Sequence, residues 1–316
     1  MEAYIHDGAS WQKSKYLYMH DGAAWQKVKE LYVSNGGTTW RCAYQSREFV
    51  LRDISGSPDV WAIVADSSGG LLAATSSGVY RYSGGSWSAI GSAGVVTSVL
   101  DVAGTYYAAS ISDVRVYSGG SWVAAGTPAA SGVSSMAMSS GGLLACKSSA
   151  TERLVAGTWS SVGIPTVRSV QTVGGTCYGT ARNGVIYNMD TLSVIVSPSV
   201  GTLVTANIHV NSATDMYTDG TYGIWKYDGA TYAVINRSDC RLMQAAYWGG
   251  TLFSAGWVHG CSRISPAGTV SPLGDQTLYT YLTDGTPTAA VVGSSLFVIF
   301  ISFSPTRYRV YEFVEK

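Results

Sequence analysis

Short runs of apolar residues, each followed by a turn that contains glycine, recur along most of the chain. The clearest stretch spans residues 60–90 and holds four such runs separated by three turns of Ser-Gly or Ser-Gly-Gly. Short apolar runs bounded by glycine are typical of β-strands, and no run has the length or the 3.6-residue period of a helix. The pattern therefore predicts an all-β protein.

The four-run unit is repeated downstream at intervals of roughly 35 to 40 residues, which is the size of a four-stranded propeller blade. Further copies begin near Val95, Val133, Val167, Ile208, Leu242 and Thr288. Together with the first copy they predict a seven-bladed β-propeller, with six or eight blades as the alternatives. Small residues fill the predicted inner strands, whereas tryptophan and tyrosine occupy the outer hairpins, where neighbouring sheets splay apart.

The last copy ends without a fourth strand. An unassigned apolar segment, residues 47–54, precedes the first copy. Pairing this segment with residues 307–314 would complete the last blade and remove an exposed sheet edge. The sequence thus predicts a propeller over residues 46–316 whose first and last strands lie in the same blade.

A different repeat, with a period of 14 residues, occupies the start of the chain. Its unit reads Tyr-x-His-Asp-Gly-x-x-Trp-Gln-Lys, and Asp-Gly or Asn-Gly supplies the positive φ values that tight turns need. We expect each unit to form one strand of about ten residues and a turn, and residues 1–45 to be too few to bury both faces of such a sheet. The large aromatic positions predicted to bind a partner or a second copy are Tyr4, Trp11, Tyr18, Trp25, Tyr32 and Trp40.

Charge and hydropathy exclude several classes of partner. The formal net charge of the 316 residues is zero, and no block of Lys and Arg marks a nucleic-acid site. The longest apolar run, residues 295–302, is far below the roughly 20 residues that cross a bilayer as a helix. The first residues lack the pattern of a secretory signal, so we expect no export signal, no membrane insertion and synthesis in a cytoplasm.

Catalytic and metal-binding patterns are weak. Most acidic residues stand next to a turn glycine, which favours a turn-forming role over the paired carboxylates of glycoside hydrolysis. The five cysteines form no Cys-x-x-Cys pair, and neither His6 and His20 nor His259 beside Cys261 belongs to a complete metal-ligand set. We therefore predict buried free thiols, no catalytic residues, no metal and no cofactor.

A binding surface is expected at the loops between second and third strands, which by analogy share one end of the ring with the connections between blades. In blades four to six and the long connection after them, these loops carry aromatic and polar residues, which suit a sugar or a protein partner. The predicted rim consists of Arg182, Asn183, Asp219, Tyr222, Trp257, His259, Tyr279 and Tyr281.

The N-terminal unit resembles the tandem aromatic-Gly-Trp-Lys repeats of bacteriophage tail and baseplate proteins. The resemblance covers residues 3–42. It implies a non-enzymatic virion protein that docks to other tail or baseplate proteins, or to copies of itself, through the arm. The propeller would then be a structural or binding module, with a host surface glycan or protein as its ligand. The alternatives are a polysaccharide-degrading or sialidase-like tail enzyme and a lectin-like propeller unrelated to phage.

Overall fold

The structure is a computed structural model of the 316-residue chain. It describes the backbone of residues 3–315 except 7–10, 15–17, 21–24, 28–29, 35–39, 46, 57, 127, 129–131, 148, 199–206, 221–222, 237–243, 249–250, 257–259, 266–269, 273–288 and 304–305. Side chains are described from Val50 on, apart from those gaps and from 219–223, 236–245, 248, 254–263, 270–272, 301–307 and 314–316. The chain divides into two compact units, one of residues 1–50 with 313–316 and one of residues 51–312.

The first unit contains three two-stranded antiparallel hairpins within its described residues. Their strands are β1 (Ala3–His6) and β2 (Trp11–Ser14), β3 (Tyr18–His20) and β4 (Trp25–Lys27), and β5 (Glu30–Ser34) and β6 (Trp40–Gln45). Each 14-residue repeat is therefore a complete hairpin, and the prediction of one long strand per repeat is wrong. The Asp-Gly pair falls between two strands of the same unit, so the repeat folds back on itself.

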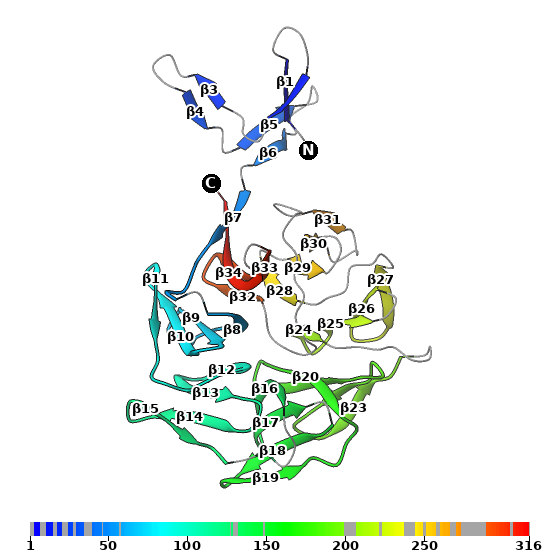
Figure 1. The fold of residues 1–316 in the computed structure, drawn as a ribbon. Helices are drawn as coiled ribbons and strands as arrows, with labels where there is room; N and C mark the ends of the chain where they lie inside the picture. Colours follow the sequence, from blue (N-terminus) through cyan, green and yellow to red (C-terminus); the bar gives the residue numbers. More distant parts are fainter. Residues whose placement is uncertain are drawn as a thin grey trace. The chain divides into compact units, whose positions relative to one another are not determined.

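The second unit is built of four-stranded antiparallel sheets, and its described residues contain no helix (Figure 1). Six of these sheets each use four strands that are consecutive in the sequence. The first three are β8 (Val60–Ala65), β9 (Leu71–Thr75), β10 (Gly78–Ser83) and β11 (Ser86–Ala89); β12 (Ser98–Val102), β13 (Thr105–Ala109), β14 (Val114–Ser118) and β15 (Ser121–Ala124); and β16 (Val133–Ser139), β17 (Gly142–Lys147), β18 (Thr151–Val155) and β19 (Thr158–Ser161). The next three are β20 (Val167–Val173), β21 (Thr176–Ala181), β22 (Ile186–Asn188) and β23 (Ser193–Val196); β24 (Ile208–Ser212), β25 (Asp215–Gly220), β26 (Gly223–Tyr227) and β27 (Tyr232–Asn236); and β28 (Gln244–Trp248), β29 (Thr251–Gly256), β30 (Gly260–Ile264) and β31 (Val270–Pro272).

A further four-stranded sheet combines the last three strands of the chain with a strand that precedes β8. Its order is β32 (Ala289–Val292), β33 (Ser295–Phe303), β34 (Thr306–Glu315) and β7 (Arg47–Leu51), so the strand from residues 47–54 lies beside the last strand. Beyond β7 the association continues, because the backbone N–H of Arg52 donates to Val310 O at 2.8 Å and the Arg52 side chain pairs with Glu312 at 2.6 Å. Arg309 pairs in turn with Asp53.

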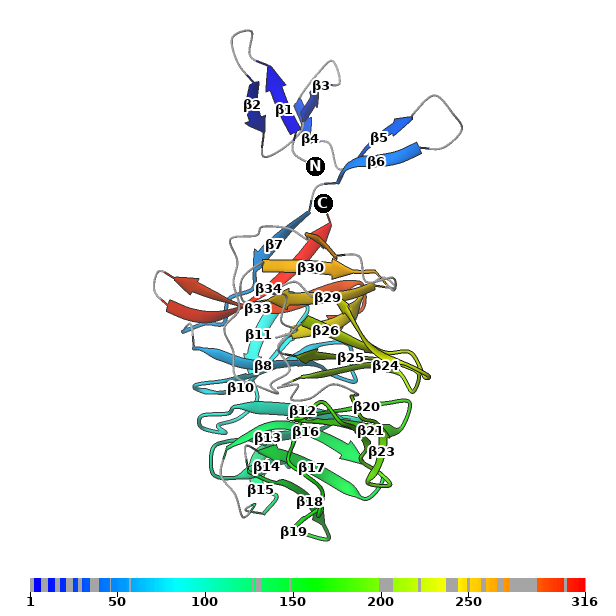
Figure 2. The ribbon, with the colours of Figure 1, turned by 90° about the vertical axis from the view of Figure 1, so that its right-hand side faces the viewer.

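The sheets follow one another around a closed ring (Figure 1), and Figure 2 shows the same sheets after a quarter turn. The first strand of each sheet contacts the first strand of the next, from β8 through β12, β16, β20, β24 and β28 to β32, and β32 contacts β8 again. Apolar side chains of neighbouring sheets share a common core. Ala74 and Val79 of one sheet, for example, pack with Val99 and Ala108 of the next. Burial between the sheets therefore holds the ring together.

Tryptophans on the outer strands fasten each of the first sheets to the connection before it. The indole of Trp87 donates to Arg52 O at 3.1 Å, and that of Trp122 donates to Ile90 O at 2.5 Å. Trp159 lies against Gly126, where an added Cβ would be 3.1 Å from the ring, but its indole nitrogen has no hydrogen-bond partner among the described residues. The tryptophans of the two Ser-Gly-Gly-Ser-Trp segments, Trp87 and Trp122, thus have a structural role in joining adjacent parts of the ring.

Candidate functional site

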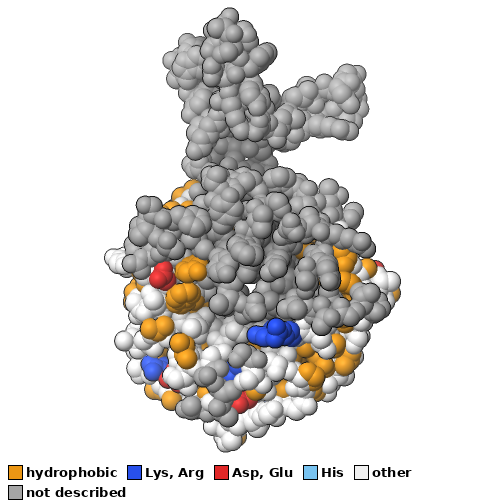
Figure 3. Space-filling view, turned by 45° about the vertical axis from the view of Figure 1, so that its right-hand side comes forward, with side chains coloured by type: hydrophobic (Ala, Val, Ile, Leu, Met, Phe, Trp, Pro, Cys, Tyr) orange, Lys and Arg blue, Asp and Glu red, His pale blue; other side chains and the backbone are white. Residues whose placement is uncertain are grey.

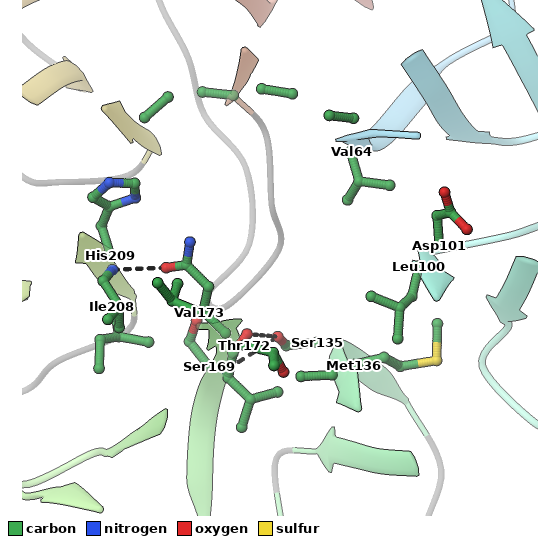
Figure 4. A pocket seen from close by; sticks show the side chains of 18 of the residues that line it. Val64, Leu100, Asp101, Ser135, Met136, Ser169, Thr172, Val173, Ile208 and His209 are labelled. Atoms are coloured by element: carbon green, nitrogen blue, oxygen red, sulfur yellow. Dashed lines mark hydrogen bonds between the residues drawn. The ribbon is translucent and has the colours of Figure 1, made fainter. Parts of the chain in front are cut away.

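A cavity of about 780 Å³ runs along the axis of the ring. Each of the first strands β8, β12, β16, β20, β24, β28 and β32 contributes to its wall. Ligand sites in proteins typically measure about 300 to 1,000 Å³, so the cavity has the size of a small-molecule site. Figure 4 shows part of the wall, with His209 and Val173 on one side and Val64, Leu100 and Asp101 across the space from them.

Polar side chains on the wall satisfy the backbone of neighbouring strands. The Gln171 Oε1 atom accepts from the Val210 N–H at 2.7 Å, and the Thr172 hydroxyl donates to Met138 O at 2.6 Å. The Ser135 hydroxyl accepts from Val170 N at 3.2 Å. First strands have a free edge toward the next sheet, and buried backbone groups must find partners there. These side chains therefore join the sheets around the channel.

One carboxylate lies among the described residues of the wall, and its oxygens are engaged. Asp101 Oδ1 accepts from Gly104 N at 2.8 Å, while Oδ2 accepts from the backbone N–H of Ser67 on the neighbouring sheet. Both contacts order the hairpin loops that follow β8 and β12. Asp101 thus has a structural role at the channel mouth.

His209 stands at the centre of a polar and aromatic group on β24, β25 and β28. Its ring stacks on Tyr247 with centroids 6.4 Å apart and planes 3° from parallel. The Nε2 atom is buried and has no hydrogen-bond partner among the described residues. Burial lowers the pKa of His209 to about 4, against the opposing effect of Asp215. The imidazole is therefore neutral at physiological pH.

Asp215 is paired with two side chains beside this ring. Lys226 Nζ lies 3.3 Å from Asp215 Oδ1, and Asn211 Nδ2 donates to Oδ2 at 2.9 Å. Burial, reinforced by the charge of Asp215, raises the pKa of Tyr217 above its ordinary value, so its phenol stays protonated. The residues around His209 carry no net charge, because the Asp215 carboxylate is balanced by the Lys226 cation.

The predicted rim lies only in part among the described side chains. Arg182 and Asn183 are exposed on the turn between β21 and β22, and neither lines the axial cavity. Asp219 belongs to β25, but its side chain lies outside the described residues. Tyr222, Trp257, His259, Tyr279 and Tyr281 also lie outside them.

None of the wall residues was predicted from the sequence, and none of the predicted arm residues is among the described residues of the wall. Tyr4, Trp11, Tyr18, Trp25, Tyr32 and Trp40 lie in the hairpin strands, but their side chains lie outside the described residues. The overlooked wall residues include Gln171, His209 and Tyr247.

Two cysteines are free and buried, as predicted for this residue type. Cys146 and Cys177 lie in the core cluster between β17 and β21. Burial raises the pKa of Cys177 to about 12 and raises that of Cys146 as well, so both thiols are protonated and unreactive. Cys42, Cys240 and Cys261 lie outside the described side chains, and no group of three metal-binding side chains occurs within the described part.

Among the described side chains, which are coloured in Figure 3, hydrophobic ones form small separate groups on the face shown. Exposed apolar residues such as Ile111 and Val194 are 63% and 55% accessible. Scattered residues of this kind are ordinary on a protein surface. Within the described residues, no helix is long and apolar enough to cross a membrane.

No protein-family profile and no curated protein matches the sequence. Solved structures match its fold. The extracellular domain of BT4673 from B. thetaiotaomicron superposes with a TM-score of 0.65 at 15% identity, over 84% of this chain and 39% of that one. The WD40 β-propeller domain of Doa1 superposes with a TM-score of 0.58 at 12% identity, over 86% and 98% of the two chains.

The chain contains a β-propeller. At identities this low the likeness establishes the fold alone. A computationally designed protein, Ika8, matches as well, with a TM-score of 0.56 and 12% identity over 78% of this chain and 81% of that one. The chain spans 39% of the BT4673 domain. The propeller fold is therefore what this chain shares with these structures.

Proposed function

We propose that the protein is a non-enzymatic component of a bacteriophage tail or baseplate, in which the N-terminal arm docks to the particle and the propeller is a binding module. The observation that carries the proposal is the threefold use of one hairpin. In each of the described hairpins a tryptophan, Trp11, Trp25 or Trp40, opens the second strand opposite the last residue of the first strand. A unit repeated with one register presents the same aromatic group at regular positions, which suits docking to a repetitive assembly.

In this proposal each four-stranded sheet is one blade, and the composite sheet that contains β7 and β34 makes the propeller seven-bladed. The ring then needs no other chain for closure. Because residues 1–45 are not needed to close the ring, the arm is suited to act as a separate docking element. The propeller, in turn, is free to bind a host surface glycan or protein.

The chemistry of the channel wall supports binding in preference to hydrolysis. Glycosidases use two carboxyl groups that flank the scissile bond. Asp101, the carboxylate of the described wall, already accepts backbone hydrogen bonds through both oxygens. Transfer of a proton at this carboxyl would disrupt the loops that it orders.

Incorporation into particles tests the docking role. Virions assembled with the double variant Trp11→Ala and Trp25→Ala should lose the protein, because each large aromatic side chain contributes several kcal/mol when it is buried at an interface. The matched control is Gln12→Ala with Gln26→Ala, which alters the next residue of the same strands. Purified protein should keep its melting temperature in both cases. Normal incorporation of the tryptophan variant would refute the docking role, and hydrolysis of a host polysaccharide by the purified protein would refute the non-enzymatic one.

A further inference from the structure

The channel has two chemically different walls. The side formed by β8, β12 and β16 is mainly apolar, with Val64, Leu100 and Met138. Its polar side chains, Asp101 and Ser135, are engaged with backbone N–H groups. The opposite side, formed by β20, β24 and β28, presents Gln171, Thr172, His209, Asn211 and Tyr247. Thr172 and Asn211 are exposed, so the polar side is open to solvent at the channel mouth. A ligand that fits both walls needs an apolar group on one side and hydrogen-bonding groups on the other.

The balance of charge along the channel selects an uncharged ligand. Asp101 is the charged residue of the described wall, and both of its oxygens are occupied by backbone N–H groups. The His209 imidazole is neutral, and Lys226 is paired with Asp215. An acidic ligand would find no counter-charge on the described wall, and an unpaired charge in such a site is costly. A basic ligand could pair only with Asp101, whose oxygens already hold two backbone N–H groups.

We propose that the channel binds a neutral saccharide that carries an acetamido group. The proposal rests on the assignment of the propeller as a binding module. Sugar hydroxyls bind well to planar amide side chains, and Gln171 uses its oxygen for Val210 while its Nε2 amide remains to donate. The paired rings of His209 and Tyr247 provide an aromatic surface for the C–H face of a pyranose. The acetamido methyl fits the apolar wall near Met138 and Leu100.

Two competing occupants are less suited to these walls. A purely apolar ligand would bury the amide and hydroxyl groups of the polar side. It would offer no hydrogen bonds in place of those that these groups make to water. A neutral peptide could satisfy these groups, but its backbone presents donors and acceptors on both sides, one of which would face the apolar wall. The saccharide places its polar and apolar groups on separate faces.

Methionine methyl groups report directly on the channel. Met138 lines the wall, whereas Met189 is fully buried between sheets and does not line it. Full-length protein labelled with ¹³C at the methionine methyl groups is titrated with N-acetylglucosamine, N-acetylgalactosamine, glucose, N-acetylneuraminic acid and a capped Ala-Ala dipeptide. At least one N-acetylhexosamine should shift the Met138 resonance saturably at roughly millimolar concentration while Met189 stays unchanged. Glucose and N-acetylneuraminic acid should bind at least about tenfold more weakly.

A matched pair of variants separates the channel from the predicted rim. Gln171→Glu keeps an oxygen for the Val210 N–H but removes the amide donor and adds a charge. Asn183→Asp makes the same change on the exposed turn of the same sheet, where the side-chain oxygen likewise accepts from a backbone N–H, that of Val185, at 3.3 Å. The first variant should weaken saccharide binding at least about tenfold, and the second should leave it unchanged.

Several outcomes overturn the proposal. They are the absence of a Met138 shift with both N-acetylhexosamines, equal or tighter binding of glucose, of N-acetylneuraminic acid or of the dipeptide, and an unchanged affinity in Gln171→Glu. A loss of affinity in Asn183→Asp alone would place the site on the rim instead. None of these results bears on incorporation into particles, so a failure of the saccharide site is distinguishable from a failure of the proposed function.

Discussion

Gln171 on β20 and Val210 on β24 are joined across two sheets by a hydrogen bond of 2.7 Å from the Val210 backbone N–H to Gln171 Oε1. The two first strands belong to different sheets, so no ladder of backbone hydrogen bonds connects them. Ser135 makes an equivalent contact with Val170 between the preceding pair of sheets. Around the channel, side chains thus replace the hydrogen bonds that a continuous barrel would make through its backbone.

Removing this side-chain bridge should destabilise the propeller moderately. Gln171→Ala leaves the partly buried Val210 N–H without its acceptor, and we expect the free energy of unfolding to fall by about 1 kcal/mol. Gln171→Glu retains the acceptor and should lose less. Urea denaturation followed by circular dichroism measures both. Equal losses in the two variants would show that the amide, and not the shared oxygen, carries the stabilisation.

The contact between Trp122 and Gly91 yields a second prediction. Gly91 has a φ of 58°, and a Cβ added there would lie 3.3 Å from Trp122 Cδ1. Gly84 has nearly the same φ, 59°, with no atom within 4 Å of an added Cβ. Gly84→Ala should cost about 1 kcal/mol for the left-handed backbone, and Gly91→Ala about 1 kcal/mol more because the alanine methyl pushes against the indole.

Thermal melts of the two glycine variants provide the comparison. Trp122 is fixed by its 2.5 Å hydrogen bond to Ile90 O, so the ring cannot move aside freely. If both variants lose the same stability, the indole moves away from the alanine methyl without an energetic penalty. The Trp122 contact then contributes little to the association of these sheets.

The strands and turns are largely predictable because they depend on local chemistry. Glycine turns and valine-rich starts mark the strands, and the predicted starts at Val60, Val133 and Val167 coincide with β8, β16 and β20. The arm hairpins were misread since a ten-residue segment with a central Asp-Gly suits either one strand with a terminal turn or two short strands. Turn residues alone do not decide between one long strand and a hairpin of two short strands.

The site was not predictable because ring closure creates it. Residues of the channel wall are about one blade apart in the sequence, and Gln171 or His209 has no neighbouring motif that indicates a shared cavity. The ion pair of Lys147 and Glu152 is a further case, since both side chains are almost fully buried although charged residues usually read as surface. Long-range packing decides such positions, and no local pattern reports it.

Acid should weaken the folded state through His209. Its pKa is about 4 in the folded protein and about 6.5 when unfolded, so below pH 6.5 the unfolded chain binds a proton that the folded chain does not. This destabilisation by His209 is absent above about pH 7 and grows as the pH falls toward 4. Near pH 4 it lowers the free energy of unfolding by about 1 to 3 kcal/mol.

The variant His209→Gln isolates this contribution, because glutamine does not titrate. The difference in unfolding free energy between variant and wild type, measured in urea from pH 7.5 to 4.5, should shift in favour of the variant as the pH decreases. A constant difference over that range would mean that His209 protonates equally in both states.

Closure of the ring by residues 47–54 leads to the last prediction. Ile54 is 2% exposed in the core cluster that contains Phe297 and Val310, and the Arg52 carbonyl accepts from the Trp87 indole. A chain that lacks residues 1–46 keeps these contacts and should melt within a few degrees of the full-length protein. A chain that lacks residues 1–54 loses a buried isoleucine and exposes the edge of β34, so its melting temperature should fall by on the order of 10 °C and it should aggregate. Calorimetry and light scattering compare the two truncations, and identical melting of both would show that the ring closes without this segment.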